Sequence, residues 1–151
     1  MTKQVRDARL ARMLTRLLTL PGRRLFQYRD AAGAVRQVRA QEVNAFLRDV
    51  VGRPISLKDF RMLMASSGAL AALSNLAPAA SERARRSQLK TAMTSVAEEL
   101  ANTPAIARKS YVHNAIVEAF EEGKLARLRK APRSSQRKAD MLAKLVARHA
   151  A

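Results

Sequence analysis

The residues best suited by type to do chemistry lie in one run, Asn102-Thr-Pro-Ala-Ile-Ala-Arg-Lys-Ser-Tyr111. Its tyrosine follows two cations, Arg108 and Lys109, near the predicted start of a helix. A tyrosine phenol is a weak nucleophile at neutral pH because forming the phenolate costs roughly 4 kcal/mol. Neighbouring positive charge lowers that cost, so this tyrosine has the means to attack a phosphodiester. By spacing alone, an ordinary half-buried aromatic on a basic helix explains Tyr111 better.

A second segment of interest is Lys58-Asp-Phe-Arg61, at the start of a predicted helix. An arginine there can be aimed at a single phosphate if the buried face of the helix anchors it. Taken by itself, Arg61 is better explained as a surface arginine. The same ambiguity holds for four cations in a later helix, which either bind the DNA backbone or form a solvated face: Arg83, Arg85, Arg86 and Lys90.

Composition indicates the elements that would position these residues. The chain has 151 residues, 48% of them hydrophobic, which suits one domain with a core. Alanine and leucine dominate and aromatics are only 4%, so helices are favoured over a sheet sandwich. We expect a mostly α-helical, multi-helix single domain with at most one small hairpin.

The order of elements follows from apolar spacing and turn residues. A helix over 6–20 ends at Pro21-Gly22, and a small hairpin joins 25–28 to 34–38. Further helices are predicted over 42–51, 57–76, 81–100 and 115–122, and a last one over 135–148 with Met141, Leu142 and Leu145 inward. The buried stripe predicted for the 57–76 helix consists of Phe60, Leu63, Met64, Ser67, Leu70 and Ala71.

Charge points to the class of partner. Twenty-nine Lys and Arg against 12 Asp and Glu give a net charge of +17, typical of a polyanion binder. A ribosomal protein, a nucleoid protein or a protein on an anionic membrane would also suit, but nucleic acid comes first. No apolar run is long enough to span a membrane, so we expect a cytoplasmic, nucleoid-associated protein and no membrane partner.

Several chemistries are disfavoured by residue type. The chain has no cysteine, which excludes disulfides, thiolate zinc sites and cysteine nucleophiles. His113 and His149 are the only histidines and lie far apart in the sequence, so a transition-metal site is not expected. We expect neither a metal nor a cofactor.

The run that ends at Tyr111 resembles the active-site tyrosine segment of type IB DNA topoisomerases, in the bacterial and poxvirus-like branch. Lys58-Asp-Phe-Arg61 is similar to a second element of that family, although Met62-Leu63 stand where the family often has Thr-Trp. The resemblance implies that Tyr111 is the nucleophile and that Arg61 clamps the scissile phosphate. It also implies that Asn102, where eukaryotic and viral members have a histidine, adds a weaker hydrogen bond.

The same resemblance implies an activity. In this family the tyrosine forms a 3′-phosphotyrosyl link to double-stranded DNA and expels a 5′-hydroxyl. The cut strand swivels to relieve supercoils, and the reverse attack reseals it without ATP or metal. We also predict Lys58, Arg108 and Lys109, beside Arg83, Arg85, Arg86 and Lys90, as DNA-binding residues.

The family pattern covers roughly residues 7–123, so we predict a topoisomerase-like catalytic fragment over 1–123 and a basic C-terminal linker and helix over 124–151. The basic run from Lys124 to Lys138 is interpreted as an arm on nucleic acid, with a solubilising end as the alternative. An upstream arginine and a hairpin lysine of the family are expected to precede Met1. An N-terminal topoisomerase portion acting in trans is therefore a candidate partner, and a chain that is inactive alone is the alternative.

Two other functions remain open. Tyrosine recombinases use the same tyrosine chemistry, but they typically have His-x-x-Arg where this chain has Lys58-Asp-Phe-Arg61. A catalytically incomplete, basic DNA-binding protein would explain the charge equally well, and its activity would not depend on Tyr111.

Overall fold

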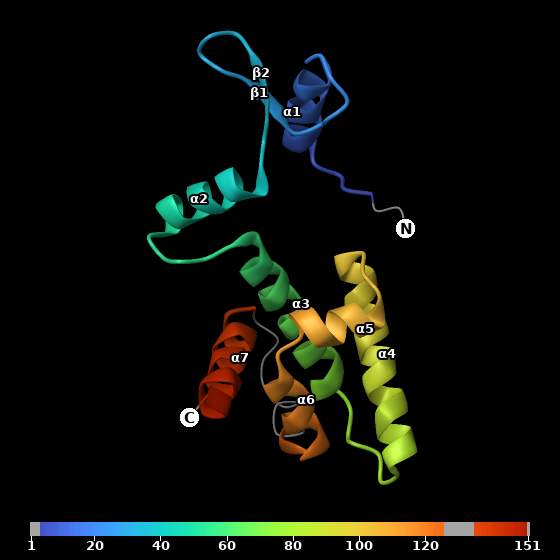
Figure 1. Cartoon of the computed structure of the whole chain (residues 1–151). Coiled ribbons are helices and arrows are strands. Elements are labelled where there is room, and N and C mark those ends of the chain that lie inside the picture. Colours follow the sequence, from blue (N-terminus) through green and yellow to red (C-terminus); the bar gives the residue numbers. More distant parts are fainter. Residues whose placement is uncertain (1–3, 126–134, 151) are drawn as a thin grey trace. The chain divides into compact units, whose positions relative to one another are not determined.

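A computed structural model of the chain describes residues 4–125 and 135–150 (Figure 1). Helices account for most of these residues, and two short strands form the one sheet found among them, which confirms the predicted mostly α-helical class with one small hairpin. Contacts divide the chain into two compact units, residues 1–57 and 58–151, and we describe each by itself. The expected boundary after residue 123 stays a prediction. No helix in the described parts is long and apolar enough to cross a bilayer.

The first unit contains a helix, a hairpin and a second helix. Helix α1, Ala8–Leu18, begins where the Asp7 carboxylate accepts the backbone N–H groups of Arg9 and Leu10 at 2.8 and 2.9 Å. Helix α2, Ala40–Val51, ends at Gly52, whose left-handed φ of 65° stops the helix as its position in the sequence predicts.

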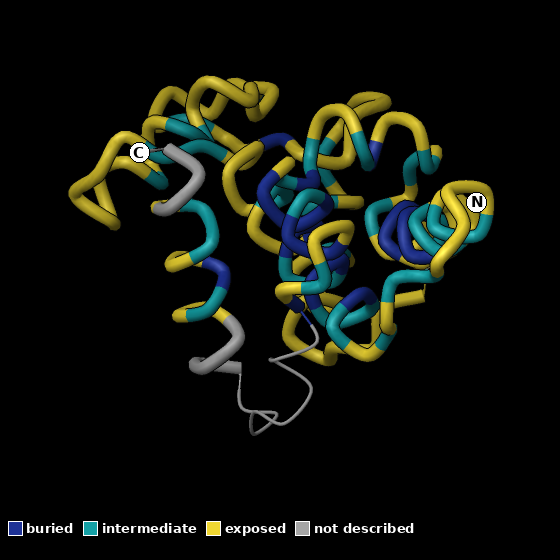
Figure 2. Tube along the Cα trace, turned by 90° about the horizontal axis from the view of Figure 1, so that it is seen from below, coloured by how far each residue is buried: buried dark blue, intermediate teal, exposed yellow. Residues whose placement is uncertain are grey.

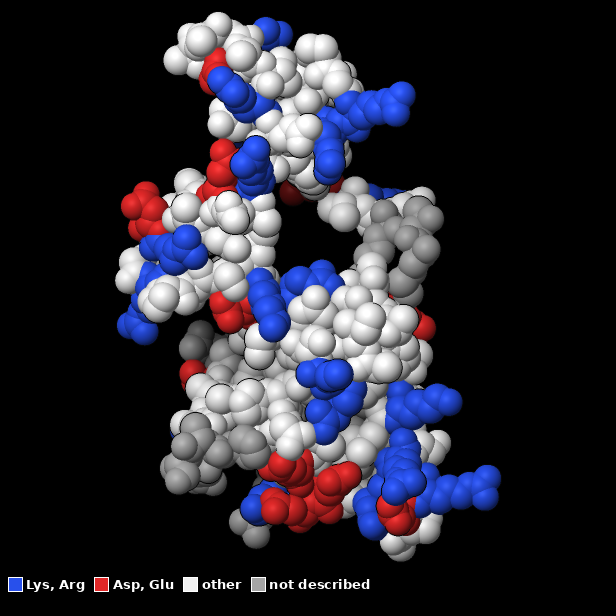
Figure 3. Space-filling model, viewed as in Figure 1, with Lys and Arg blue, Asp and Glu red and all other residues white. Residues whose placement is uncertain are grey.

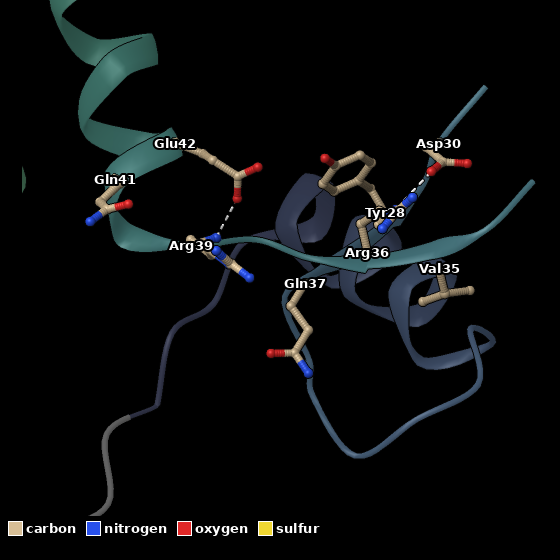
Figure 4. A pocket seen from close by; sticks show the side chains of 8 residues that line it. All are labelled: Tyr28, Asp30, Val35, Arg36, Gln37, Arg39, Gln41 and Glu42. Atoms are coloured by element: carbon tan, nitrogen blue, oxygen red, sulfur yellow. Dashed lines mark hydrogen bonds and ion pairs between the residues drawn. The ribbon is translucent and has the colours of Figure 1, made fainter. Parts of the chain in front are cut away.

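The hairpin pairs β1, Gln27–Arg29, with β2, Val35–Gln37, in antiparallel register. Asp30 stabilises its turn, because the carboxylate accepts the N–H groups of Ala32 and Ala34 and pairs with Arg36 at 2.8 Å. The Arg36 hydrogen bond, with those backbone N–H groups, lowers the pKa of Asp30. Beside the hairpin lies a polar pocket, in which Asp30 and Glu42 both accept hydrogen bonds from within the unit (Figure 4). None of the predicted catalytic residues lines it.

The second unit holds the core. It comprises α3, Leu57–Ser74, of which Leu57 belongs to the first unit, and then α4, Glu82–Leu100, α5, Pro104–Ile106, the π-helical turn η1, Ala107–Tyr111, α6, Asn114–Glu121, and α7, Ser135–Ala150. Every buried hydrophobic side chain among the described residues lies in this unit, from Ala65 to Leu142. Figure 2 shows these segments gathered in the middle of the helices. Phe120, Leu70, Leu73 and Ile116 are the largest of the fully buried side chains.

Of the stripe predicted to be buried on α3, only Leu70 is buried, and Ser67 and Ala71 are partly exposed. Phe60, Leu63 and Met64 are exposed, and burial starts only at Ala65, where the helix meets the others. Its buried face consists of Ala65, Ser66, Ala69, Leu70 and Leu73. These residues are mostly small, because α4 approaches closely: a side chain at Gly68 would lie 3.4 Å from a methyl of Val96. The sequence prediction followed the largest apolar side chains, and so it shares only Leu70 with the buried face.

Helix α7 packs against the core of the second unit. Leu142 is buried in its core, and Met141 and Leu145 pack against that core, as their spacing predicts. Most of the basic run from Lys124 to Lys138 lies outside the described residues. The interpretation of that run as a DNA-binding arm therefore stays a prediction.

Candidate active site

Tyr111 lies at the end of a short helical segment. The Thr103 hydroxyl accepts the N–H of Ile106 at 3.3 Å and Pro104 follows it, so α5 begins where the sequence predicts. The segment then widens into η1, in which the N–H of Val112 reaches the carbonyl of Ala107 at 2.9 Å. Val112 is extended, so the helical segment that carries Tyr111 stops there, and α6 follows as a separate helix. Such π turns occur frequently at functional sites.

Arg61 and Tyr111, fifty positions apart in sequence, are in contact. The Arg61 guanidinium carbon lies 4.8 Å from the centroid of the Tyr111 ring, a cation–π geometry. Its Nη2 also donates to the carbonyl of Leu100 at 3.0 Å. A guanidinium carries five N–H donors, so further donors remain for another acceptor beside the phenol.

Asn102 follows this carbonyl by two residues. Its backbone N–H donates to the carbonyl of Ala97 at 2.8 Å, which closes the end of α4. This turn requires Ala101 to adopt a left-handed conformation, with φ 52° and ψ 48°. The backbone of Asn102 is thus fixed next to the carbonyl that Arg61 binds, while the position of its amide relative to Tyr111 stays a prediction.

Ala101 provides a test of this turn. An L-residue in the left-handed region costs the folded state roughly 1–2 kcal/mol, a cost that glycine avoids. Glycine also makes the unfolded chain more flexible, which lowers stability by less than about 1 kcal/mol. Ala101→Gly is therefore expected to raise the free energy of unfolding by about 0.5–1 kcal/mol. Urea denaturation measures it. Ala139→Gly, at an exposed position in α7, should instead lose about 1 kcal/mol, and a loss in both variants would contradict the argument.

A buried serine holds the Tyr111 segment against α3. The Ser66 hydroxyl donates to the carbonyl of Tyr111 at 3.3 Å and accepts the N–H of His113 at 3.1 Å. His113 then caps α6 through its Nδ1, which accepts the N–H of Ala115 at 3.2 Å. Tyr111 is consequently fixed on its ring by Arg61 and on its backbone by Ser66.

Three of the predicted DNA-binding cations lie close in sequence to Arg61 or Tyr111. Lys58 is exposed one turn before Arg61, a spacing that places two side chains on neighbouring parts of a helix surface. Lys109 is exposed on η1. Arg108 is half-buried and donates to the amide oxygen of Asn114, whose own amide donates to Glu118.

The other four predicted cations lie elsewhere. Arg83, Arg85, Arg86 and Lys90 occupy the first half of α4, and its rise places Arg83 about 25 Å from Leu100 along the axis. Figure 3 shows Lys and Arg side chains gathered over this end of the unit. Arg86 pairs with Glu82. The structure therefore separates this basic cluster from the Arg61–Tyr111 pair.

Arg85 has a structural task that its sequence position does not reveal. Its Nη1 donates to the carbonyls of Ala79 and Ala80, both at 2.9 Å, and so closes the loop between α3 and α4. Because hydrogen bonds from charged groups contribute about 1.5–3 kcal/mol, discounted here for partial exposure, Arg85→Ala is expected to cost roughly 1–2 kcal/mol of stability. Chemical denaturation measures it, with Arg86→Ala as the matched control, since an exposed pair contributes under about 1 kcal/mol. Equal losses in both variants would contradict the assignment.

Sequence reasoning missed Ser66, the Leu100 carbonyl and the left-handed Ala101. Only Ser66 left a signal, because a serine among the small residues of a helix face is buried only when its hydroxyl has partners. Backbone carbonyls and turn conformations leave no such trace. Among the described residues, no three His, Asp or Glu side chains are grouped as ligands of a metal ion.

The chain is mostly helical and carries a net charge of +17, and its second unit brings an arginine to the ring of a tyrosine. The family model described as eukaryotic DNA topoisomerase I, catalytic core, matches residues 1–139. DNA topoisomerase 1B of Acanthamoeba polyphaga mimivirus is 29% identical over 112 residues, which cover 70% of this chain and 33% of that protein. The chain therefore belongs to the DNA topoisomerase I family and spans about a third of the length of this curated relative.

Proposed function

We propose that this chain carries the tyrosine-bearing part of a type IB topoisomerase site and acts on double-stranded DNA in the cytoplasm, on the nucleoid. The observation that carries the proposal is the contact between Arg61 and Tyr111, at 4.8 Å from guanidinium carbon to ring centroid. It brings a cation to the side chain that would attack a phosphate. Family membership supports the same substrate.

In the proposed reaction the Tyr111 phenolic oxygen attacks a DNA phosphorus. The new oxygen–phosphorus bond forms as the bond to the 5′-oxygen breaks, giving a 3′-phosphotyrosyl link and a 5′-hydroxyl. The phenol loses a proton and the leaving oxygen gains one. One phosphoester replaces another, so the reverse attack reseals the strand after swivelling and needs no ATP.

The charged neighbours have separate roles in this proposal. Arg61 keeps free N–H donors for the non-bridging oxygens, where negative charge develops in the transition state. Asn102 adds an amide donor near the same place. Lys58, Arg108 and Lys109 bind the DNA backbone close to the reacting phosphate, and Arg83, Arg86 and Lys90 bind it farther away.

The remaining part of the relative's length suggests a further partner. The matched residues cover only 33% of the mimivirus protein, so other residues of such a catalytic domain have no counterpart among them. We propose that these residues join the site from an N-terminal topoisomerase portion, acting in trans when that portion is a separate chain. Adding such a portion should raise the rate of supercoil relaxation.

A DNA duplex with a 5′-bridging phosphorothiolate at one position tests the proposal. The thiolate of this substrate leaves without a proton, so no residue is needed to protonate the leaving group. Adduct formation then depends only on the nucleophile and the phosphate clamp. We expect a covalent adduct after a detergent quench, with DNA mapped to Tyr111 by peptide mass spectrometry. Salt-dependent DNA binding with no adduct would instead identify a DNA-binding protein without strand cleavage.

A further inference from the structure

The strongest unassigned feature of the second unit is the contact between α3 and the turn after Tyr111. Ser66 is only 4% exposed, and it and Gln27 are the two buried polar residues among those that the structure describes. The Ser66 hydroxyl donates to the carbonyl of Tyr111 and accepts the N–H of His113, at 3.3 and 3.1 Å. One side chain thus contacts the backbone on both sides of Val112.

These backbone groups lie where helical hydrogen bonding stops. The segment η1 ends at Tyr111, Val112 is extended, and α6 begins only at Asn114. At such a break, carbonyl and N–H groups need partners outside the helix. A hydroxyl is suited to both, since it donates and accepts at once. Ser66 therefore fixes the place at which the chain leaves η1.

The same helix also carries the arginine. Arg61 and Ser66 are both on α3, and they contact the ring and the carbonyl of the same tyrosine. Any shift of η1 relative to α3 would therefore change the distance between the guanidinium and the phenol. Misplacing a reacting group by about 1 Å can slow a reaction by about 100-fold.

We propose that Ser66 is a positioning residue for Tyr111. Through its two hydrogen bonds to the backbone, Ser66 keeps the Tyr111 phenol in place beside the Arg61 guanidinium. The proposal rests on the proposed function for its catalytic consequence. Its structural consequence, a single orientation of the Tyr111 ring, can be measured without DNA.

The first test compares single-turnover cleavage of the phosphorothiolate duplex at saturating protein. Ser66→Ala is expected to lower the cleavage rate by about 10- to 100-fold and to leave the dissociation constant for DNA unchanged, since Ser66 is buried. Ser66→Cys fills the site with a slightly larger side chain whose thiol is only a weak donor and acceptor, so it should behave like the alanine variant. Ser67→Ala, on the adjacent position, should cleave normally.

The second test observes the tyrosine directly. The chain has two tyrosines and no tryptophan, so 3-fluorotyrosine in a Tyr28→Phe background reports Tyr111 alone. We expect one sharp ¹⁹F resonance, which shifts and broadens in Ser66→Ala. Leu73→Ala, two turns further along α3 in the core, controls for general loss of stability and should leave the resonance in place.

The two tests separate failure of this inference from failure of the proposed function. If the native protein cleaves DNA and Ser66→Ala has the same cleavage rate and the same resonance, the positioning role is overturned. The assignment of Tyr111 as the nucleophile is then unaffected. A Ser66→Cys variant with native rate and resonance would show that volume matters, not hydrogen bonding, and would also overturn the positioning role. If no variant forms an adduct, the proposed function fails, and the resonance still decides whether Ser66 orients the ring.

Discussion

Replacing Tyr111 by phenylalanine is expected to abolish covalent adduct formation on the phosphorothiolate duplex. The substitution removes only the phenolic oxygen, which is the atom proposed to attack phosphorus. The ring stays, so its contact with the Arg61 guanidinium and the fold of η1 should stay as well. The dissociation constant for DNA should change little, because it depends mainly on the cations.

Tyr28→Phe is the matched control for this experiment. Tyr28 is the other tyrosine of the chain and is exposed on β1, in the first unit. This variant should form adducts at the native rate. Adducts that persist in Tyr111→Phe, or that map to Tyr28, would mean that Tyr111 is not the nucleophile.

Replacing Arg61 by alanine is expected to lower the single-turnover cleavage rate by about 10²- to 10³-fold, the usual effect of losing one donor to developing negative charge. DNA affinity should fall far less, because one phosphate contact is lost among several. Arg61→Lys keeps the positive charge but loses the planar set of guanidinium donors. Its cleavage rate should therefore lie between those of the native protein and Arg61→Ala. Rapid-quench measurement at saturating protein separates the rate from affinity.

Arg61→Ala also removes a link within the second unit, so its stability must be measured beside its rate. The guanidinium bonds the Leu100 carbonyl and covers the Tyr111 ring, and the loss of both contacts is expected to cost about 1–2 kcal/mol. Arg83→Ala, at an exposed position in the first turn of α4, controls for loss of positive charge. Equal cleavage rates in Arg61→Ala and Arg83→Ala would contradict a phosphate clamp at Arg61.

The predicted DNA-binding residues fall into two groups, one near Arg61 and Tyr111 and one in the first half of α4. Helix α4 carries its cations in the first half, while its last turn supplies the Leu100 carbonyl to Arg61. Both features belong to one helix but lie at opposite ends of it. Duplex DNA extends over many base pairs, so in the proposed function the basic cluster adds to DNA affinity, although it lies too far from Tyr111 to take part in the proposed chemistry.

Sequence by itself determined the helical class, some of the helix ends and the residue types of the candidate site. Thr103 and Gly52 mark helix ends in the structure because capping depends on a side chain or a glycine at one position. The charge of +17 indicated a polyanionic partner for a similar reason, since it is a sum over residues. The motifs around Arg61 and Tyr111 gave the family, which the comparisons confirm.

Only the tertiary structure decided which of these residues meet. Most of the stripe predicted for α3, apart from Leu70, is not buried, because amphipathic spacing favours large side chains, whereas close approach of α4 selects small ones. The π turn at Tyr111 and its anchor on Ser66 depend on contacts across 45 residues, which no local pattern encodes. Arg85 and Arg108 look alike as cations in the sequence, yet backbone carbonyls bind one and an asparagine amide binds the other. A residue's type limits its chemistry, but its partners are fixed by packing.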